Sequence, residues 1–394
     1  MANKKSNNNK VFKDETSLYS RYSISTLFLK FFVTLLLTNK ITKKISLWMM
    51  RFILNKKNKF FIRFLNGVYF GGESIDEAKA NVIFLSKNNI HSILDYAIEG
   101  KNDEIFFDNA LESTLKLIDL ASKESNIPYV AIKPSSLGDI HLYEEKMRGW
   151  NFFGEKINSW SRILERYEKI FHYAEIKSVK VMIDAEQSWI QAAVDKIVID
   201  SIIKHNKILP IITLTIQSYK KESIDLLMLL HKIAIDNNIK VGIKIVRGAY
   251  LEEEIKNKEK SIGTFFLNKE ETDLNYNYLV EYISKRIEYF YPFFVTHNEN
   301  SISIILNKNE LKNKSFWIGQ LYGIGDHISS KLAYNGIRTC KYLPYGPIDK
   351  SLPYLLRRIN ENAVASDTFV TENRKIMKEI ILRLKNTGDK NGCL

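Results

Sequence analysis

Short apolar runs alternate with longer helical stretches along the chain from about residue 90 onward. Eight of these runs are rich in β-branched and aromatic residues, which is typical of strands. They are HSILDY (91–96), YVAIKPS (129–135), KVMIDAE (180–186), PIITLTIQ (210–217), VGIKIVRGAY (241–250), FFVTHN (293–298), SFWIGQLYG (315–323) and TCKYLPYG (339–346). The alternation predicts eight βα units and a parallel sheet. Eight such units that close on themselves form a (βα)8 barrel, so we expect this α/β fold with an N-terminal helical extension.

The pattern predicts four parts. Residues 1–20 are polar and rich in Asn and Lys, which is typical of a frayed or disordered end. Residues 21–88 form the predicted N-terminal helical region, residues 89–375 the barrel, and residues 376–394 the end of the last helix and a tail. No G-x-G-x-x-G follows the first strand run, which argues against a doubly wound dinucleotide-binding fold.

The N-terminal region mixes Lys and Arg with large apolar residues from residue 24 to residue 70. Its most apolar run, residues 24–37, is interrupted by Lys30 and is shorter than the ~20 residues of a membrane-spanning helix. We therefore expect amphipathic helices that dock on the body of the protein. The alternative is a segment that lies on a membrane surface.

Composition narrows the possible classes of function. Hydrophobic residues make up 45% of the 394 positions and charged residues 26%, so the chain has the material for a sizeable core. The net charge of +13 is spread along the chain, and no element interleaves basic and aromatic residues, so we expect no nucleic-acid partner. Cys340 and Cys393 are the only cysteines, and the histidines lack ligand spacing. We expect no structural metal, and a reducing compartment such as the cytoplasm.

Titratable residues interrupt several predicted strands near their C-terminal ends. Barrel strands are covered on both faces, so a charge inside one is costly unless it is paired or used. The exceptions are Lys133, Asp184, Lys244, Arg247 and His297. Because barrel active sites lie at this end of the strands, we expect these residues to carry the chemistry. Taken singly, a lysine there is more often solvated and Asp184 is an alternative helix cap.

Smaller polar signals follow other strand runs. Gln217 and Gln320 each end a run, where an amide either holds a ligand or closes a loop. Gly248 and Ala249 leave little side-chain bulk after Arg247, which suits a planar ligand or simply a turn.

Two adjacent arginines, Arg357 and Arg358, follow the last strand run, in a helix that Pro353 begins. Adjacent side chains on a helix differ by ~100° in direction, so both arginines cannot face solvent on a helix that packs against a barrel. Guanidinium groups bind carboxylates bidentately, and the pair predicts a carboxylate clamp. Glu361 lies at helical spacing from both and is expected to support them. The alternative is an ordinary surface ion pair.

Spaced motifs in this order resemble the flavin-dependent proline dehydrogenases. They are FGGESIDEA near residue 70, SILDYAIEGK, VMIDAEQSWIQ, KIVRGAYLEEEIK, VTHN, QLYGIGDHIS and YLPYGPIDKSLPYLLRRINEN. The resemblance implies an FAD-binding (βα)8 barrel that oxidises L-proline to 1-pyrroline-5-carboxylate by hydride transfer from C5, the first step of proline catabolism to glutamate. It also implies a membrane quinone as electron acceptor, with residues 24–70 as a peripheral contact on the inner membrane face.

The resemblance also implies roles for individual residues. The implied substrate-binding residues are Lys133, Asp184, Leu321, Tyr342, Arg357 and Arg358, with Glu361 in support. The implied flavin-binding residues are Ala185, Gln217, Lys244, Arg247, Gly248, Ala249, Thr296, His297 and Asn298. Asp184, Lys244 and Arg247 are the expected catalytic residues.

Two departures from the family pattern and two alternatives stay open. Some relatives carry arginine at the position of Lys244 and lysine at that of Arg247, so which cation lies nearer flavin N5 is not assigned. Pro134 must end the second strand abruptly, which re-aims Lys133 unless the following loop compensates. The alternatives are another flavin barrel oxidoreductase, such as one reducing a folate imine, and a non-catalytic amino-acid-binding barrel.

Overall fold

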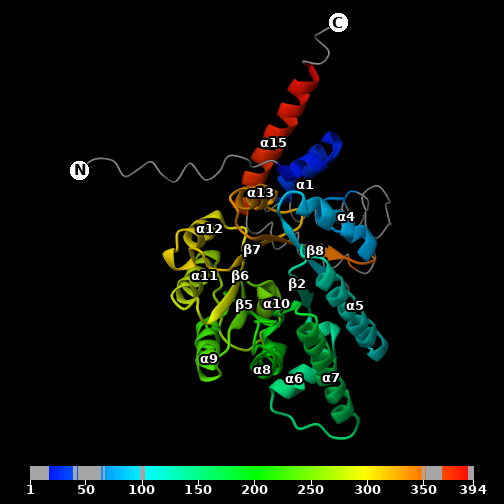
Figure 1. Cartoon of the computed structure of the whole chain (residues 1–394), viewed down its shortest axis with the longest axis vertical. Helices are drawn as coiled ribbons and strands as arrows, with labels where there is room; N and C mark the ends of the chain where they lie inside the picture. Colours follow the sequence, from blue (N-terminus) through cyan, green and yellow to red (C-terminus); the bar gives the residue numbers. More distant parts are fainter. Residues whose placement is uncertain are drawn as a thin grey trace, which may run out of the picture. The chain divides into compact units, whose positions relative to one another are not determined.

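Eight β-strands form one closed barrel in chain order in the computed structural model of the chain (Figure 1). The strands are β1 (His91–Tyr96), β2 (Tyr129–Ile132), β3 (Lys180–Ile183), β4 (Ile212–Gln217), β5 (Val241–Val246), β6 (Phe290–Val295), β7 (Trp317–Leu321) and β8 (Thr339–Tyr345). Each of the eight predicted strand runs overlaps one of them, so the predicted α/β barrel is confirmed. The structure describes residues 17–38, 42, 64, 67–97, 103–347, 351 and 366–388.

Helices lie between the strands along the chain, and further helices precede β1 and follow β8. Those between strands are α5 (Glu104–Lys123), α6 (Ile140–Met147), α7 (Glu155–Ile176), α8 (Ser188–His205), α9 (Ser223–Asp236), α10 (Leu251–Lys256), α11 (Lys269–Ser284), α12 (Glu299–Leu306) and α13 (Asp326–Tyr334). Short 3-10 turns η2 (Pro134–Ser136) and η3 (Asn309–Leu311) lie among them. η1 (Ser17–Arg21), α1 (Ile24–Thr38) and α4 (Ile75–Ser86) precede β1, and α15 (Ser366–Gly388) follows β8.

The chain divides into two compact units, which we describe separately. The central unit comprises Ile93–Asp95 and Glu99–Ile318, and the terminal unit comprises Met1–Ser92, Tyr96–Ile98 and Gly319–Leu394. The central unit therefore carries most of the strands and α5 to α12. The terminal unit carries both ends of the chain together with α13 and β8.

Aromatic side chains fill the interior of the barrel in the central unit. The ring of Tyr129 on β2 lies 5.3 Å from that of Phe293 on β6, and Trp317 stacks on Phe293 at 6.4 Å. Strands β2 and β6 stand four places apart in the barrel order, so their side chains meet only across its interior. Tyr129 and Phe293 are fully buried, as expected for a packed barrel rather than a pore.

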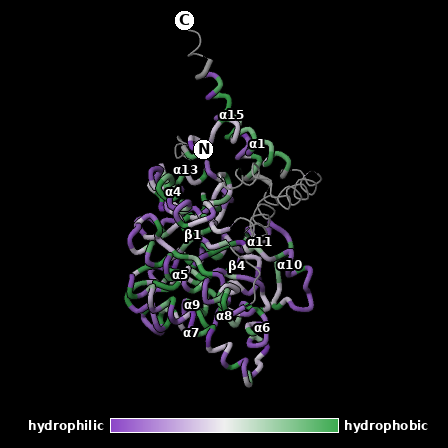
Figure 2. The backbone as a smooth tube through the Cα atoms, turned by 90° about the vertical axis from the view of Figure 1, so that its right-hand side faces the viewer, coloured by the Kyte–Doolittle hydropathy of each residue, from purple (hydrophilic) through white to green (hydrophobic). Residues whose placement is uncertain are grey.

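The terminal unit is held by an apolar core that both terminal helices share. Leu27 and Val33 of α1 pack with Ile376 and Ile380 of α15, and α1 and α15 lie side by side (Figure 1). Hydrophobic and hydrophilic positions alternate along α15 in Figure 2, as an amphipathic helix requires. The packing of α1 agrees with the predicted amphipathic helix, and Lys30, which interrupts its apolar run, is fully buried.

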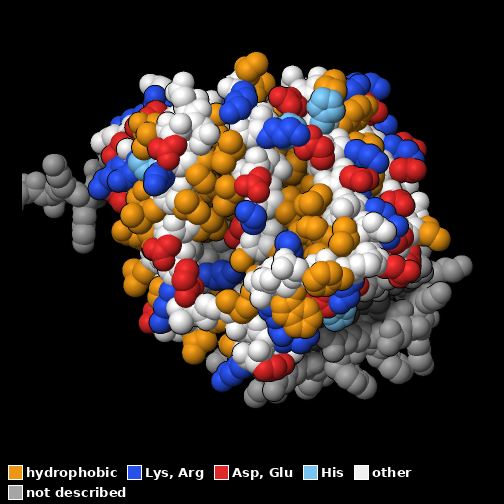
Figure 3. Space-filling view, turned by 90° about the horizontal axis from the view of Figure 1, so that it is seen from below, with side chains coloured by type: hydrophobic (Ala, Val, Ile, Leu, Met, Phe, Trp, Pro, Cys, Tyr) orange, Lys and Arg blue, Asp and Glu red, His pale blue; other side chains and the backbone are white. Residues whose placement is uncertain are grey.

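Surface composition bears on possible partners. On the face drawn in Figure 3, Lys and Arg side chains are interspersed with Asp and Glu among the described residues. On that face neither sign of charge covers a broad area by itself. Within the parts of the chain that the structure describes, no helix is both long enough and apolar enough to cross a membrane.

Candidate active site

Strand register places three of the predicted polar residues at one level of the barrel. Ile132, Ile183, Leu214 and Ile243 pair across neighbouring strands β2 to β5. The residues that follow them are Lys133, Asp184, Thr215 and Lys244. The charged residues predicted from sequence therefore lie at one level near the carboxyl ends of β2, β3 and β5, where barrel enzymes place their chemistry.

Asp184 and Lys244 form a buried ion pair across this level. The Lys244 ammonium donates to Asp184 Oδ1, and the side chains belong to residues that are only 4% and 8% exposed. The Asp184 backbone N–H donates to the Ile132 carbonyl at 2.9 Å, which fixes the carboxylate to the end of β2. The pair holds a cation in place within a poorly hydrated site, where its field acts strongly on a bound ligand.

Lys133 is paired with Asp95, a residue that the sequence analysis did not select. The Lys133 ammonium donates to Asp95 Oδ1, and both residues are almost fully buried. Asp95 interrupts the apolar run HSILDY near its C-terminal end, so the rule that found Lys133 also applied to it. Asp95 Oδ2 is buried without a hydrogen-bond partner among the described residues, which leaves it an acceptor for a ligand donor.

The loop after Lys133 is fixed by a second missed residue, Glu186. β2 ends at Ile132 and η2 begins at Pro134, so the abrupt end predicted from Pro134 is confirmed. The Glu186 carboxylate accepts hydrogen bonds from the backbone N–H and the hydroxyl of Ser135 at 2.8 and 2.7 Å. Lys133 itself keeps an extended backbone and reaches Asp95. Glu186 is the last residue of the run KVMIDAE in the sequence, but it lies after β3, which ends at Ile183.

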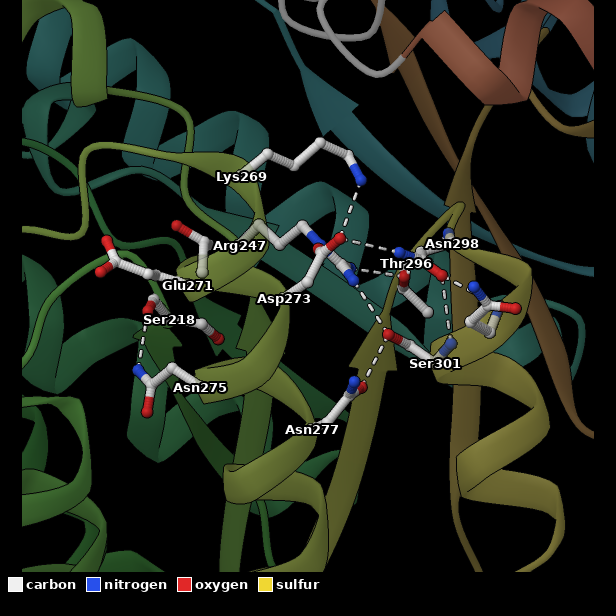
Figure 4. A network of polar contacts seen from close by, with 12 residues as sticks. Ser218, Arg247, Lys269, Glu271, Asp273, Asn275, Asn277, Thr296, Asn298 and Ser301 are labelled. Carbon is white, nitrogen blue, oxygen red and sulfur yellow. Dashed lines mark hydrogen bonds and ion pairs between the residues drawn. The ribbon is translucent and has the colours of Figure 1, made fainter.

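Arg247 lies at the centre of a polar network that joins β5, β6, α11 and α12 (Figure 4). Its Nε donates to Asp273, one terminal nitrogen donates to Thr296 Oγ1 at 2.6 Å, and the other donates to Ser301 Oγ at 2.9 Å. The guanidinium also stacks 4.4 Å from the centre of the Tyr276 ring. These contacts use three of its five N–H donors and fix its plane, so two donors are left for an anionic ligand.

Asp273 connects Arg247 to Asn298, another residue of the predicted flavin set. Asp273 Oδ2 accepts from Lys269 at 2.8 Å and from Asn298 Nδ2 at 3.1 Å. Burial alone would raise the pKa of Asp273, but the hydrogen bond from Lys269 and the charge of Arg247 together hold that pKa below its usual value. Asn298 also caps α12 through the N–H groups of Asn300 and Ser301. The network is therefore ionised and rigid near neutral pH.

The other predicted flavin residues of the central unit lie at the same strand ends. Gln217 ends β4, and its Nε2 donates to the Glu186 carbonyl at 3.2 Å. Gly248 follows Arg247 with φ at +112°, and a Cβ there would lie 1.9 Å from the ring of Tyr219, so only glycine fits. The remaining members are half-buried. They are Ala185, Ala249 and His297.

The remaining predicted substrate residues fall in the terminal unit or outside the described residues. Tyr342 is buried on β8, and its carbonyl accepts from the N–H of Tyr322, the residue after Leu321, at 3.0 Å. Arg357, Arg358 and Glu361 lie outside the described residues, so the carboxylate clamp stays a prediction.

The donor set of the central unit suits an anionic cofactor. Lys244 lies on β5 and Arg247 directly follows it. The Thr296 hydroxyl contacts Arg247, and the Asn298 amide contacts the Asp273 that holds Arg247. Such cations and donors are what a flavin dinucleotide needs for its diphosphate and its reduced ring. No group of His, Cys, Asp and Glu residues within the described ranges has the arrangement of a metal site. The residues present therefore fit FAD, which the family pattern implies.

Comparison with known proteins places these residues in a family. Residues 78–372 match the family Proline dehydrogenase. The chain is 44% identical to the carbapenem antibiotics biosynthesis protein CarD of Pectobacterium carotovorum subsp. carotovorum over 94% of this chain and 98% of that protein. It is 28% identical to the mitochondrial proline dehydrogenase 1 of Dictyostelium discoideum over 90% of this chain and 72% of that protein.

Solved structures agree with the fold. Proline utilization A (PutA) from Bdellovibrio bacteriovorus superimposes with a TM-score of 0.68 at 20% identity, covering 88% of this chain. The chain spans 38% of the length of that solved protein. Family match and motifs together lead to one conclusion: the chain belongs to the proline dehydrogenase family of oxidoreductases.

Proposed function

We propose that this chain is an FAD-dependent proline dehydrogenase that oxidises L-proline to 1-pyrroline-5-carboxylate. The observation that carries the proposal is one level of buried charges, Lys133, Asp184 and Lys244, near the carboxyl ends of β2, β3 and β5 in a chain of this family. Bound FAD would supply a two-electron acceptor for the hydride that leaves proline C5.

The residues of the chain would bind and orient the reactants. Lys244, held by Asp184, and Arg247, held by Asp273, would offer positive charge to the flavin. Ala185, Gln217, Gly248, Ala249, Thr296, His297 and Asn298 would complete the flavin contacts. Which of Lys244 and Arg247 lies nearer flavin N5 stays open, as does the group that takes the amine proton.

The proposed substrate contacts are those that the family pattern implies. Arg357 and Arg358 would bind the proline carboxylate, with Glu361 holding one guanidinium. Leu321 and Tyr342 would pack on the ring, and Lys133, which Asp95 holds, would line the pocket with Asp184. Fixing the carboxylate orients C5 for hydride transfer without a protein nucleophile.

An absorption spectrum of the purified full chain tests the proposal. We expect a yellow protein whose flavin band bleaches on anaerobic addition of L-proline. A colourless protein that binds proline would instead support the non-catalytic alternative. A yellow protein that proline leaves unbleached would support another flavin barrel oxidoreductase. Arg357→Met and Arg358→Met variants that stay yellow but need far more proline to bleach would support the clamp.

The electron acceptor and membrane contact form a separate part of the proposal. We propose a membrane quinone as acceptor, reached by peripheral contact through residues 24–70. In support, α1 exposes Phe28, Phe32 and Leu35 at 46%, 56% and 47%, at helical spacing. Most of residues 39–66 lie outside the described residues. Co-sedimentation with anionic vesicles should fall on Phe28→Ser/Phe32→Ser substitution; sedimentation that is indifferent to this change would refute the contact.

A second candidate concerns the fate of the product. The 44% identity with a carbapenem biosynthesis protein favours use of the oxidised product in antibiotic biosynthesis rather than in catabolism to glutamate. Deleting the gene would abolish growth on proline as sole nitrogen source under the catabolic role. Under the biosynthetic role growth would persist and antibiotic production would stop.

A further inference from the structure

Four charged side chains form a buried cluster in the terminal unit, which we call the buried tetrad. Lys30 of α1 lies 3.2 Å from Asp326 and 2.7 Å from Glu372 of α15, measured from its Nζ to a carboxylate oxygen. Lys341 of β8 lies 2.9 Å from Asp326, at the start of α13. None of the four residues is more than 1% exposed.

Stability alone does not account for the buried tetrad. Each of its charged groups had to be removed from water, and apolar residues of similar volume often serve stability as well or better. Arg21 adds a further cation 3.8 Å from Asp326. Burial alone would raise the pKa of Asp326, but Lys30, Lys341 and Arg21 hold that pKa far below its usual value. Burial lowers the pKa of Lys341, and the neighbouring Asp326 opposes that shift. Asp326 is therefore ionised near neutral pH, and the groups that the tetrad contacts indicate its role.

The tetrad holds the backbone of residues 321–326, from the last residue of β7 to the first residue of α13. Lys341 Nζ donates to the carbonyls of Leu321 and Ile324 at 3.2 and 2.7 Å. Glu372 accepts from the Gly325 N–H at 3.1 Å. Charges from β8 and α15 thus fix both donors and acceptors along this segment, which a purely apolar contact does not do. Lys30 of α1 pairs with both carboxylates of the tetrad.

The same segment is also fixed by its own conformation. Gly325 is left-handed with φ at +62°, and a Cβ on Gly323 would lie 2.0 Å from the Val68 carbonyl oxygen. The Tyr322 hydroxyl donates to Asn81 Oδ1 at 2.5 Å and receives a hydrogen bond from Arg21. The segment therefore has one arrangement, and the terminal helices are part of what sets it.

We infer that Lys30 and Glu372, on the two terminal helices, are positioning residues that set the segment from Leu321, the last residue of β7, to Asp326. Glu372 acts on the Gly325 N–H, and Lys30 acts through the carboxylates of Asp326 and Glu372. The inference rests on the proposed function, because Leu321 is assigned to the substrate ring. It gives α1 and α15 an indirect part in substrate recognition, since neither residue touches the substrate.

Steady-state kinetics of the full-length holoenzyme test the inference. In Lys30→Met and in Glu372→Gln, KM for proline should rise about tenfold while kcat changes by less than about threefold, since a displaced Leu321 would lose contact with the bound ring in the ground state and the transition state alike. Lys79→Met, which removes an exposed ion pair with Asp76 on α4, should leave both constants unchanged. A variant that is less stable but keeps the parental KM would show a merely structural role.

The double variant Lys30→Met/Glu372→Gln separates positioning from stability. It removes one charge of each sign, so its thermal stability should recover relative to the single variants, while KM stays raised. A parental KM in a stable double variant would overturn the inference. This variant also keeps the test decisive if either single variant fails to fold.

Amide hydrogen exchange gives a readout that does not depend on proline oxidation. Exchange in the peptide covering residues 319–328 should rise at least tenfold in the double variant, while peptides covering β3 and β5 keep parental protection. Unchanged protection in that peptide would overturn the inference, whatever the substrate. If the parent fails to bleach with proline but the exchange result holds, the proposed function fails and the positioning role stands.

Discussion

Replacing Lys244 with methionine is expected to lower kcat/KM for proline by at least about a hundredfold and the free energy of unfolding by about 3 kcal/mol. The Lys244 ammonium donates to Asp184 at a site where both residues are buried. Methionine fills a similar volume but leaves the Asp184 carboxylate without its Lys244 partner, and it removes the cation offered to the flavin. Kinetics with an artificial electron acceptor and denaturant unfolding measure the two effects.

Two further variants separate the two effects of Lys244→Met. Lys204→Met removes a lysine that pairs with Glu168 but whose side chain is 60% exposed, so it should change stability by less than about 0.5 kcal/mol and leave kcat/KM at the parental value. Lys244→Met/Asp184→Asn removes both charges, so its stability should recover while its activity stays low. Parental activity in Lys244→Met would exclude a catalytic role for this cation.

The fold was predictable because each barrel strand can be recognised from its own local sequence. Each strand is a short apolar run, and the periodicity of the stretches between them is helical. The rule that a charge inside such a run must have a use selected Lys133, Asp184 and Lys244, and the register then set them at one level. Asp95 also interrupts an apolar run, near the end of β1. The same rule therefore predicts a role for Asp95 from the sequence.

Other site residues were not predictable from local pattern. Asp273 lies on α11 among polar neighbours, where a carboxylate reads as part of a solvated helix face, and only the folded chain brings it to Arg247. Lys30 was visible as an interruption of an apolar run, but its partners Asp326 and Glu372 lie about 300 residues further along the chain. Which carboxylates pair with a buried lysine over such separations depends on how the chain packs. The sequence therefore shows that Lys30 interrupts an apolar run but not which residues it contacts.

Replacing Arg247 with methionine is expected to weaken FAD binding by about ten- to a hundredfold. Arg247 joins Asp273, Thr296 and Ser301, and hydrogen bonds to charged groups contribute about 1.5–3 kcal/mol each. Losing the guanidinium removes two donors proposed for the flavin and the hydrogen bond from Arg247 to Thr296. Flavin absorbance per chain after gel filtration, and titration of the apoprotein with FAD, measure the loss.

A matched arginine elsewhere provides the control for Arg247. Arg286 also stacks on a tyrosine, 3.9 Å from the centre of the Tyr282 ring, but this tyrosine lies on α11 and not at a strand end. Arg286→Met should therefore keep parental flavin content. Arg247→Lys keeps the charge but not the planar fork that reaches three partners at once, so it should bind FAD with intermediate affinity. Parental FAD affinity in a folded Arg247→Met would mean that the polar network around Arg247 serves only to join β5, β6, α11 and α12. Lys244 would then be the cation that contacts the flavin.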